Sequence, residues 1–471
     1  MRIEQIYTKC LAQGAYYIES DGEAAVIDPL RKVSEYIELA KKSNSKIKYV
    51  FETHFHADFV SGHLTLSKKT GAPIVYGPNA DPDFDAIIAK DNEQFKIGKI
   101  TLTTIHTPGH TLESTSYLLK DEFGKDHCIF TGDTLFLGDV GIPDVAQRYM
   151  GVSKEELAGI LYESVNNRIK PLSDELLVYP GHGAGSACGK NMMKETVDTL
   201  ANQKKINYAL NGSFSKVAFV KELTDNLPEP PGYFPLNVKL NQEGYLDFET
   251  VLEKNSIPLA INDFELLAED KDTIILDVRN QKDFIDGHIP NSLFIGLNGT
   301  FAPWVGTLIK DINQKILLIT PVGKETEAIT RLSRIGYDNC IGFLKGGFKT
   351  WKKNKNKITK LNSVSATSFV DTLKLNKINI LDVRKVSEYN NNHIETSHNK
   401  PLSNIGNEFN NIDKEGDIYV HCAGGYRSVI AISILKQKGF ENLIDVAGGF
   451  GAIKKSNLNE SCYNSTVQCN G

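Results

Sequence analysis

Residues 48–63 read KYVFETHFHADFVSGH, and the prediction of the fold starts from this stretch. KYVF is a short apolar run typical of a buried strand. It leads into His54-Phe55-His56-Ala57-Asp58, and His63 follows five residues later. Three further motifs end in a potential ligand: TPGH at His110, FTGD at Asp133 and YPGH at His182. Because each motif follows an apolar run or contains a Gly turn, we predict loops that hold a metal-binding cluster rigidly.

The sequence around this stretch alternates strand-like and helical segments. AAVIDP is followed by an amphipathic segment from Val33 to Lys42 and then by IKYVFETH. Such alternation predicts a layered α/β domain. Four prolines between Pro228 and Pro235 are expected to exclude a helix or a central strand there. We place the end of this first domain near residue 255.

The remainder of the chain contains an internal repeat. IILDVRNQKDFIDGHIPNS begins at Ile274, and INILDVRKVSEYNNNHIETS begins at Ile378. Each copy continues with a second buried strand, a helix, a Gly-aromatic break and a Gly-Gly-Phe turn. Such a repeat indicates one α/β unit that has been duplicated. We predict domains at residues 256–358 and 359–471.

Composition narrows the class of protein. At roughly 150 residues per domain, a length of 471 residues predicts about three domains. With 41% apolar residues, 24% charged residues and a net charge of -5, we expect a globular protein with no nucleic-acid partner. No run of 18 apolar residues occurs, so we expect no membrane association. Seven cysteines are few and odd in number, which favours the reducing cytoplasm.

The histidine motifs together carry a resemblance. THFHADFVSGH, PGHTLEST, FTGDTLFLGDVG and YPGHGAGSACG look like the metallo-β-lactamase superfamily and, within it, most resemble persulfide dioxygenases fused to rhodanese domains. The resemblance extends over the whole chain. It implies an α/β fold in which an N-terminal metallo-β-lactamase αββα sandwich, residues 1–255, is followed by two rhodanese-like α/β domains. Asp28 in VIDP would be the acidic residue that supports the metal loops.

This resemblance also implies a metal site. Dioxygenases of the family hold one Fe(II), and their ligands correspond to His54, His110 and Asp133, a set of two histidines and one carboxylate that leaves three coordination positions open. The remaining motif residues are then expected to orient these ligands or to bind substrate: His56, Asp58, His63 and His182. Cys188, in the Gly-rich loop after His182, is a spectator, a sulfane-sulfur acceptor or a site of oxidation.

Two positions depart from the pattern of relatives. Two-metal hydrolases such as glyoxalase II carry a histidine where this chain has Phe59. A phenyl ring cannot coordinate a metal, so we expect a single mononuclear site. Ile142 stands where many relatives have arginine, which leaves the identity of the thiol substrate open.

The second repeat carries a reactive thiol in YVHCAGGYRS. Cys422 follows a buried strand and precedes a helix expected to begin near Ser428. The glycines let backbone amides turn inward, and the helix N-terminus and Arg427 favour a thiolate or a persulfide. The loop resembles that of rhodanese sulfurtransferases, and its length fits sulfur transfer better than phosphate chemistry. Its expected persulfide-binding residues are Ala423, Gly424, Gly425, Tyr426 and Ser428.

The first repeat has no thiol at the matching position, where it reads Ile319-Thr320-Pro321. We interpret this copy as a rhodanese-like fold without rhodanese chemistry, serving as a spacer or docking surface. Cys340, at the start of a predicted strand, is expected in the core. Cys462 and Cys469 lie in an Asn/Ser-rich tail with no motif around them.

The resemblance implies two linked reactions in sulfide detoxification. A low-molecular-weight thiol persulfide, such as that of glutathione or coenzyme A, would be oxidised by O2 to sulfite and thiol. Cys422 would then transfer sulfane sulfur to sulfite, giving thiosulfate. One alternative is a glyoxalase II-like Zn thioester hydrolase fused to a sulfurtransferase, and another is a non-catalytic sulfur carrier or sensor. Relatives commonly associate, so a homo-oligomer is also implied, although no residue pattern demands one.

Overall fold

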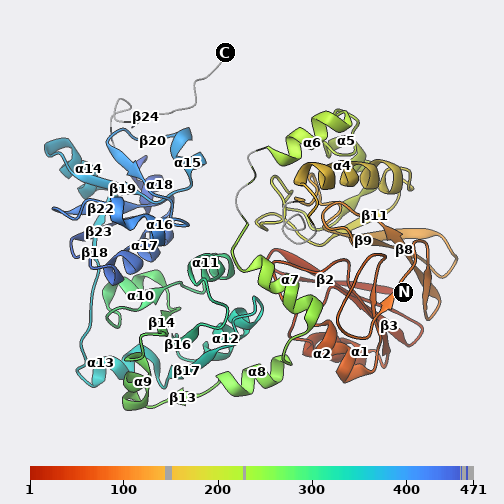
Figure 1. The fold of residues 1–471 in the computed structure, drawn as a ribbon, viewed down its shortest axis with the longest axis horizontal. Coiled ribbons are helices and arrows are strands. Elements are labelled where there is room, and N and C mark those ends of the chain that lie inside the picture. The colour runs from red at the N-terminus through yellow and green to blue at the C-terminus, as the bar shows by residue number, and fades with distance from the viewer. Residues whose placement is uncertain (144–150, 226, 228–229, 457, 459–462, 465–471) are drawn as a thin grey trace. The chain divides into compact units, whose positions relative to one another are not determined.

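The computed structural model describes residues 1–143, 151–225, 227, 230–456, 458 and 463–464 (Figure 1). The chain divides into two compact units, Met1–Val251 with Thr330–Tyr337 and Leu252–Ile329 with Asp338–Gly471. Cys462 and Cys469 lie outside the described residues. Within the described ranges, no helix is both long and apolar enough to cross a bilayer.

The first unit contains two six-stranded sheets. One comprises, in spatial order, β1 (Arg2–Thr8), β2 (Gln13–Ser20), β3 (Glu23–Ile27), β4 (Lys46–Phe51), β5 (Ile74–Tyr76) and β6 (Ile87–Ile88). The other comprises β12 (Asp198–Thr199), β11 (Leu177–Pro180), β10 (Asp126–Gly132), β9 (Thr115–Lys120), β8 (Ile100–His106) and β7 (Gln94–Ile97). The strands predicted in AAVIDP and IKYVFETH are therefore confirmed as β3 and β4.

Alternating side chains of these strands build the layers. In β2, Tyr16 packs between the two sheets, whereas its neighbour Tyr17 packs toward the helices outside the first sheet. In β10, Phe130 joins the core between the sheets, whereas Ile129 packs in the cluster outside the second sheet. Since successive residues of a strand point to opposite faces, each sheet buries both faces. The result is the predicted αββα sandwich (Figure 1).

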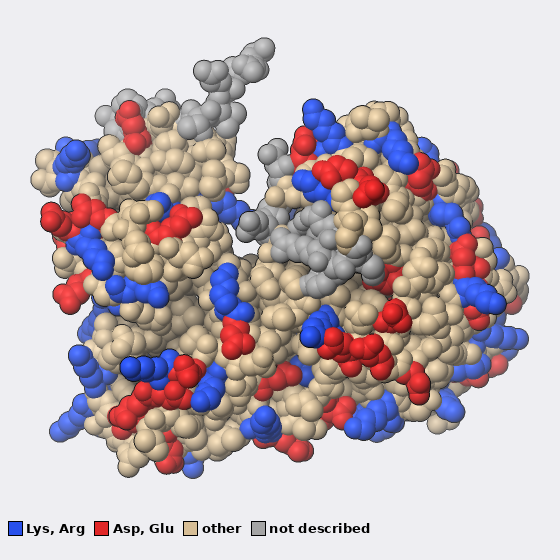
Figure 2. Space-filling model, viewed as in Figure 1, with Lys and Arg blue, Asp and Glu red and all other residues tan. Residues whose placement is uncertain are grey.

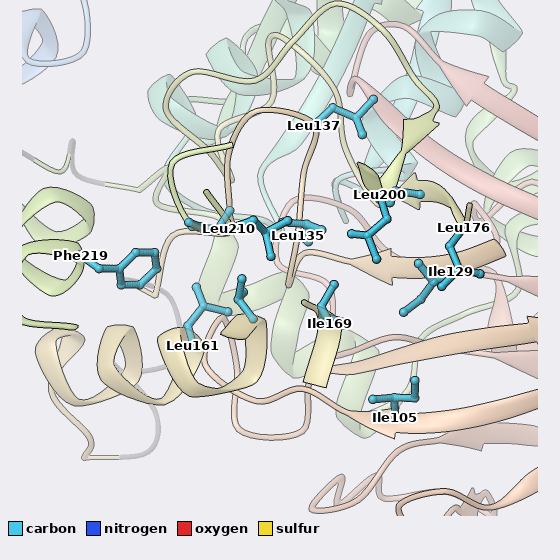
Figure 3. Close-up of a cluster of buried hydrophobic side chains, with 14 of the residues drawn as sticks. Ile105, Ile129, Leu135, Leu137, Leu161, Ile169, Leu176, Leu200, Leu210 and Phe219 are labelled. Atoms are coloured by element: carbon cyan, nitrogen blue, oxygen red, sulfur yellow. The ribbon is translucent and has the colours of Figure 1, made fainter. Parts of the chain in front are cut away.

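Helices cover both outer faces of the sandwich. Leu161 and Phe219, from two of these helices, pack in the same buried cluster as Ile129 (Figure 3). Ser153 begins the first of them with a capping box to Glu156, which satisfies backbone N–H groups at the helix start. The described helices and the helical turn between Met1 and Asn255 are α1 (Ser34–Lys42), α2 (His63–Thr70), α4 (Lys154–Ser164), a π-turn (Val165–Ile169), α5 (Leu200–Ile206), α6 (Lys216–Thr224), α7 (Phe234–Glu243) and α8 (Phe248–Asn255).

The expectation that the segment from Pro228 to Pro235 excludes a helix is wrong for the last two residues of that segment. Helix α7 begins at Phe234 and carries Pro235 in its first turn. The N–H that proline lacks has no partner inside a helix at that position, so the helix loses no hydrogen bond.

The second unit contains the two repeat copies, each with a five-stranded parallel sheet. The first copy has the order β13 (Pro258–Leu259), β17 (Cys340–Leu344), β16 (Lys315–Ile319), β14 (Thr273–Asp277) and β15 (Leu293–Phe294). The second has β18 (Asn362–Ser365), β23 (Leu443–Ala447), β22 (Ile418–His421), β19 (Asn379–Asp382) and β21 (Ser397–Asn399). Corresponding strands take corresponding places, so the duplication is confirmed.

The Leu-Asp-Val-Arg motif forms an internal ion pair in each copy. Nε of Arg279 donates to Oδ1 of Asp277 at 2.9 Å, and Nε of Arg384 donates to Oδ1 of Asp382 at 3.0 Å. The remaining described elements of the chain are α9 (Ile261–Ala268), α10 (Gln281–Asp286), α11 (Phe301–Leu308), α12 (Glu325–Ser333), α13 (Gly347–Lys353), α14 (Ala366–Leu375), α15 (Val386–Asn391), α16 (Ile405–Glu408), a 3-10 turn (Phe409–Asn411), α17 (Tyr426–Gln437), α18 (Gly449–Ile453) and the strand pair β20 (His393–Ile394) and β24 (Tyr463–Asn464).

Charged side chains of both signs are interspersed on the face shown in Figure 2. Among the described residues of this face, lysine and arginine do not gather into one broad basic surface.

Candidate metal centre and thiol loop

Three predicted ligands of the first unit meet where their strands end. His54 follows β4, His110 follows β8 and Asp133 follows β10. One ligand atom from each lies within 4.8 Å of the other two, and all three side chains are buried. Nε2 of His110 lies 3.6 Å from Oδ2 of Asp133. The structure thus brings together the two histidines and the carboxylate that the sequence motifs singled out.

The donor atoms of this cluster suit a metal ion. Neither carboxylate oxygen of Asp133 has a hydrogen-bond partner among the described residues, although both are buried. Burying an unpaired carboxylate lowers the stability of the folded protein unless a cation compensates the negative charge. Burial and the neighbouring histidines hold the pKa of His54 well below its usual value, so His54 is neutral. Metal coordination requires neutral imidazoles and an ionised carboxylate.

Backbone and hydroxyl groups orient the two imidazoles. Nδ1 of His110 lies 2.9 Å from the carbonyl oxygen of Ile142, to which it can donate. Nδ1 of His54 lies 3.0 Å from Oγ1 of Thr53. Such bonds fix the ring and leave Nε2 free for a metal. Sequence reasoning noticed Ile142 only as a missing arginine and overlooked that its backbone, which any residue supplies, positions His110.

Asp28 and His56 lie beside the three-ligand cluster and contact residues that adjoin it or one another. Asp28 accepts hydrogen bonds from the backbone N–H and the hydroxyl of Thr53, at 2.8 and 2.9 Å. Nε2 of His56 lies 3.2 Å from Asp28 and 3.3 Å from Glu52. Burial alone would lower the pKa of His56, but these carboxylates outweigh it and raise the pKa well above its usual value. His56 is therefore directed toward the acidic pair rather than grouped with the three ligands.

His63 lies further from the cluster. Its Nδ1 is 3.7 Å from Oε1 of Glu52, and its ring packs against Phe84. Burial lowers the pKa of His63 to about 3, so the ring is neutral. His63 belongs to none of the groups of donors that could hold a metal ion among the described residues.

A second group of donors lies beside Asp133. It consists of Asp58, His182 and Cys188, whose ligand atoms lie within 4.8 Å of one another. Nε2 of His182 is 3.5 Å from Oδ2 of Asp58 and 3.7 Å from Oδ1 of Asp133. The two oxygens of Asp133 thus face one donor group each. This second group could hold another cation.

Cys188, and not Phe59, supplies the third donor of this second group. Phe59 is buried and stacks on His56, with ring centroids 4.3 Å apart, so it contributes no ligand. The Cys188 backbone instead accepts a hydrogen bond from the N–H of Ile142 at 2.9 Å, which fixes the loop of the thiol. Burial, Asp58 and Asp133 together raise the pKa of the Cys188 thiol well above its usual value. The position of this cysteine six residues after His182 was the available signal.

In the second unit, Cys422 lies at the carboxyl end of β22, a central strand of a parallel sheet. Ligand sites in such sheets form at this edge. Cys422 is 1% exposed, and its sulfur accepts a hydrogen bond from the backbone N–H of Gly425 at 3.1 Å. Gly425 has φ +96°, which only glycine adopts readily. Helix α17 begins at the next residue, Tyr426, two residues before the predicted start.

Two polar residues complete the loop. Ser428 lies 3.9 Å from the sulfur, and its hydroxyl donates to Asp445 at 2.7 Å. Arg427 forms a bidentate pair with Glu388 of α15, at 2.6 and 2.8 Å. Although burial acts in the opposite direction, this pairing raises the pKa of Arg427 and lowers that of Glu388. Sequence reasoning assigned Arg427 to the thiolate and missed its carboxylate partner.

The first copy has the same fold at this position but no thiol. Thr320 and Pro321 follow β16, and α12 begins at Glu325. Cys340 starts β17 and is buried, as predicted, and burial raises its pKa to about 12. Among the described residues, the second unit therefore carries one cysteine in a glycine-rich loop.

Comparisons with known proteins agree with this architecture. Residues 9–182 match the metallo-beta-lactamase superfamily, and residues 260–354 and 365–456 each match the rhodanese-like domain. A crystal structure of a metallo-beta-lactamase from Staphylococcus aureus subsp. aureus COL is 30% identical with a TM-score of 0.63, and the match covers 73% of this chain and 99% of that one.

Two kinds of curated enzyme match the first unit at nearly equal identity. The cytoplasmic hydroxyacylglutathione hydrolase of Arabidopsis thaliana is 31% identical, over 37% of this chain and 66% of the relative. The mitochondrial persulfide dioxygenase ETHE1 of Homo sapiens is 30% identical, over 44% of this chain and 74% of the relative. The chain spans 59–66% of the length of the hydroxyacylglutathione hydrolases of Arabidopsis thaliana, Schizosaccharomyces pombe and Dictyostelium discoideum. The chain belongs to the metallo-β-lactamase superfamily, and its metallo-β-lactamase domain is followed by two rhodanese-like domains.

Proposed function

We propose that this protein is a non-haem Fe(II) persulfide dioxygenase coupled to a sulfurtransferase. The observation that carries the proposal is the buried set of His54, His110 and Asp133, with both carboxylate oxygens lacking a hydrogen-bond partner among the described residues. Two histidines and one carboxylate are the donor set typical of oxygen-activating iron sites. The similarity to persulfide dioxygenases supports the same assignment.

Side chains and backbone groups of the chain would bind the metal ion and hold its ligands in place. His54, His110 and Asp133 would hold the ferrous ion, which supplies the binding of persulfide sulfur and the activation of O2. Thr53 and the carbonyl of Ile142 keep the imidazoles oriented, so little reorganisation is needed. The overall reaction is RSSH + O2 + H2O → RSH + SO3²⁻ + 2H⁺, in which the outer sulfur is oxidised and O2 is reduced.

Cys422 performs the second reaction. Its thiolate attacks the outer sulfur of a persulfide, the S–S bond breaks, and the thiol RSH leaves with the proton. The N–H of Gly425 stabilises the negative sulfur. Sulfite then attacks the outer sulfur of the cysteine persulfide and releases thiosulfate, which regenerates the thiolate. The sum is RSSH + SO3²⁻ → RSH + S2O3²⁻.

A zinc-dependent thioester hydrolase fused to a sulfurtransferase is the second candidate. The position of Asp58, His182 and Cys188 beside Asp133 favours it, because a second metal ion there would create a two-metal site. The similarity to hydroxyacylglutathione hydrolases also favours it. The absence of a ligand at Phe59, which packs on His56, argues against it.

Anaerobic purification followed by metal analysis and activity assays separates the two candidates. If the protein is a persulfide dioxygenase, we expect it to contain about one equivalent of iron and to take up O2 with glutathione persulfide or coenzyme A persulfide. If it is a hydrolase, we expect it to contain zinc and to cleave a glutathione thioester. Full zinc occupancy in a protein that consumes no O2 with either persulfide would overturn the proposal.

A further inference from the structure

Helix α17, which begins in the thiol loop, is covered from two sides. Every residue from Ser428 to Leu435 is buried. A helix that is buried all round needs packing partners on opposite faces. Its own sheet supplies one. The first copy supplies the other: the N–H of Phe294 donates to Oγ of Ser433 at 3.1 Å, and Nε2 of Gln437 donates to the carbonyl of Asn291 at 2.9 Å.

The same contact reaches Gly425, the residue that touches the reactive sulfur. Its carbonyl accepts a hydrogen bond from Nε2 of Gln281 at 2.9 Å and also lies 2.7 Å from the hydroxyl oxygen of Ser428. Gln281 is the first residue of α10 and belongs to the copy without a thiol. The N–H of Gly425 meanwhile points at the Cys422 sulfur. A glycine at positive φ has few steric restraints, so hydrogen bonds on both sides decide where this N–H points.

Tyr426, the next residue, is held by the first copy as well. Its hydroxyl donates to the carbonyl of Gly296 at 2.8 Å, and its ring lies edge-on to Phe294 with centroids 5.8 Å apart. The ring also lies directly against Gly299. A Cβ on Gly299 would be 2.2 Å from a ring carbon of Tyr426, so only glycine fits without displacing the ring.

We propose that the thiol-less copy is a positioning element for sulfur transfer, and that Gln281 is its main positioning residue. Gln281 holds the carbonyl of Gly425, and the surface around Gly299 holds the ring of Tyr426. Together they keep the Gly425 N–H directed at the sulfur of Cys422. This inference rests on the proposed role of Cys422 as the sulfur carrier. It assigns the first copy a part in the reaction beyond that of a spacer or docking surface.

The test uses the full chain and four variants: Gln281→Ala, Gln281→Glu, Gln314→Ala and Gly299→Ala. Gln281→Ala removes the donor, and Gln281→Glu keeps the side-chain shape while replacing the amide donor by a carboxylate. Gln314→Ala is the matched control, since Gln314 also donates to a backbone carbonyl, that of Asp272, but within the first copy alone. Sulfur transfer from thiosulfate to cyanide gives kcat and KM. Mass spectrometry follows the alkylation of Cys422 by iodoacetamide across pH.

We expect both Gln281 variants to lose about 3- to 10-fold in kcat/KM, which corresponds to one hydrogen bond. Alkylation of Cys422 should slow by a similar factor at neutral pH and match the wild type at high pH, where the thiol is ionised in every variant. The control should behave like the wild type in both assays. Gly299→Ala, which displaces Tyr426 without touching Gln281, should reproduce the loss.

Three results would overturn the inference. Wild-type kinetics in Gln281→Ala would show that the contact does not position the loop. Wild-type kinetics in Gln281→Glu would show that packing, not donation, matters. Equally slow alkylation at every pH would indicate altered access to the thiol. Failure of the proposed function is distinct from these, because Cys422→Ser would then still transfer sulfur.

Discussion

Replacing Gly181 by alanine tests whether the position of Asp133 controls metal binding. A Cβ on Gly181 would lie 2.5 Å from Oδ1 of Asp133 and 3.0 Å from the carbonyl carbon of Gly132. Gly181 is not among the glycines with positive φ, so alanine adds no backbone strain. The effect of the substitution is therefore steric and falls on one candidate ligand.

The magnitude follows from the geometry. Cβ atoms in proteins stay at least 3.0 Å from other atoms, so the carboxylate or its loop has to move by about 0.5 Å or more. Metal–ligand distances tolerate deviations of only ~0.2 Å. We expect metal affinity to fall by about 10- to 100-fold, the range found when ligand orientation is disturbed. Overpacking should also lower the free energy of unfolding by about 1–3 kcal/mol.

Titration with a competing chelator measures this affinity, and urea unfolding measures stability. Gly159→Ala is the control, because a Cβ there meets only the flexible Lys216 side chain at 3.4 Å and the site lies within helix α4. The control should bind metal normally. A folded Gly181→Ala protein with wild-type metal affinity would refute the argument that Asp133, held in this position, ligates the metal.

Three further outcomes are expected. Cys422→Ser should still consume O2 with a persulfide but release sulfite, and unchanged thiosulfate by ion chromatography would exclude Cys422 as the carrier. Cys188→Ser should still bind about one equivalent of iron, and loss of a second metal equivalent in elemental analysis would instead favour the two-metal hydrolase. Burial lowers the pKa of His288 to about 4. The unfolded state therefore binds more protons than the folded state between about pH 6.5 and 4, and stability is lost as the pH falls through this window, by up to about 3 kcal/mol. His288→Phe should remove that slope from urea midpoints, and an unchanged slope would refute it.

Much of the fold could be predicted because it depends on local patterns. The apolar runs before His54 and Cys422 form β4 and β22, and the repeated Leu-Asp-Val-Arg motif marks two sheets with the same strand order. A strand followed by a glycine-rich or polar loop is a short-range signal. The meeting of His54, His110 and Asp133 was inferred from resemblance, and the ends of three different strands bring them together.

Several contacts could not be predicted because they join residues far apart in the sequence. Cys188 lies close to Asp58, 130 residues away in the sequence, and its carbonyl accepts a hydrogen bond from the N–H of Ile142. Glu388 forms an ion pair with Arg427, which is 39 residues away in the sequence. Gln281 forms a hydrogen bond with Gly425, which is 144 residues away in the sequence. No periodicity or motif encodes such pairs, since each depends on how separate elements pack.

The sequence by itself therefore determined the kinds of chemistry in this protein: a histidine and aspartate cluster on strand ends, a cysteine in the glycine-rich loop of the second repeat copy, and a first repeat copy without that cysteine. These follow from residue type and spacing, which local backbone physics translates directly into strands, turns and loops. The tertiary structure alone decided which donors share Asp133, which carboxylate holds Arg427, and that the thiol-less copy contacts Gly425 and Tyr426. Those arrangements arise from packing between distant segments, where the burial of apolar faces brings polar groups together that the sequence keeps apart.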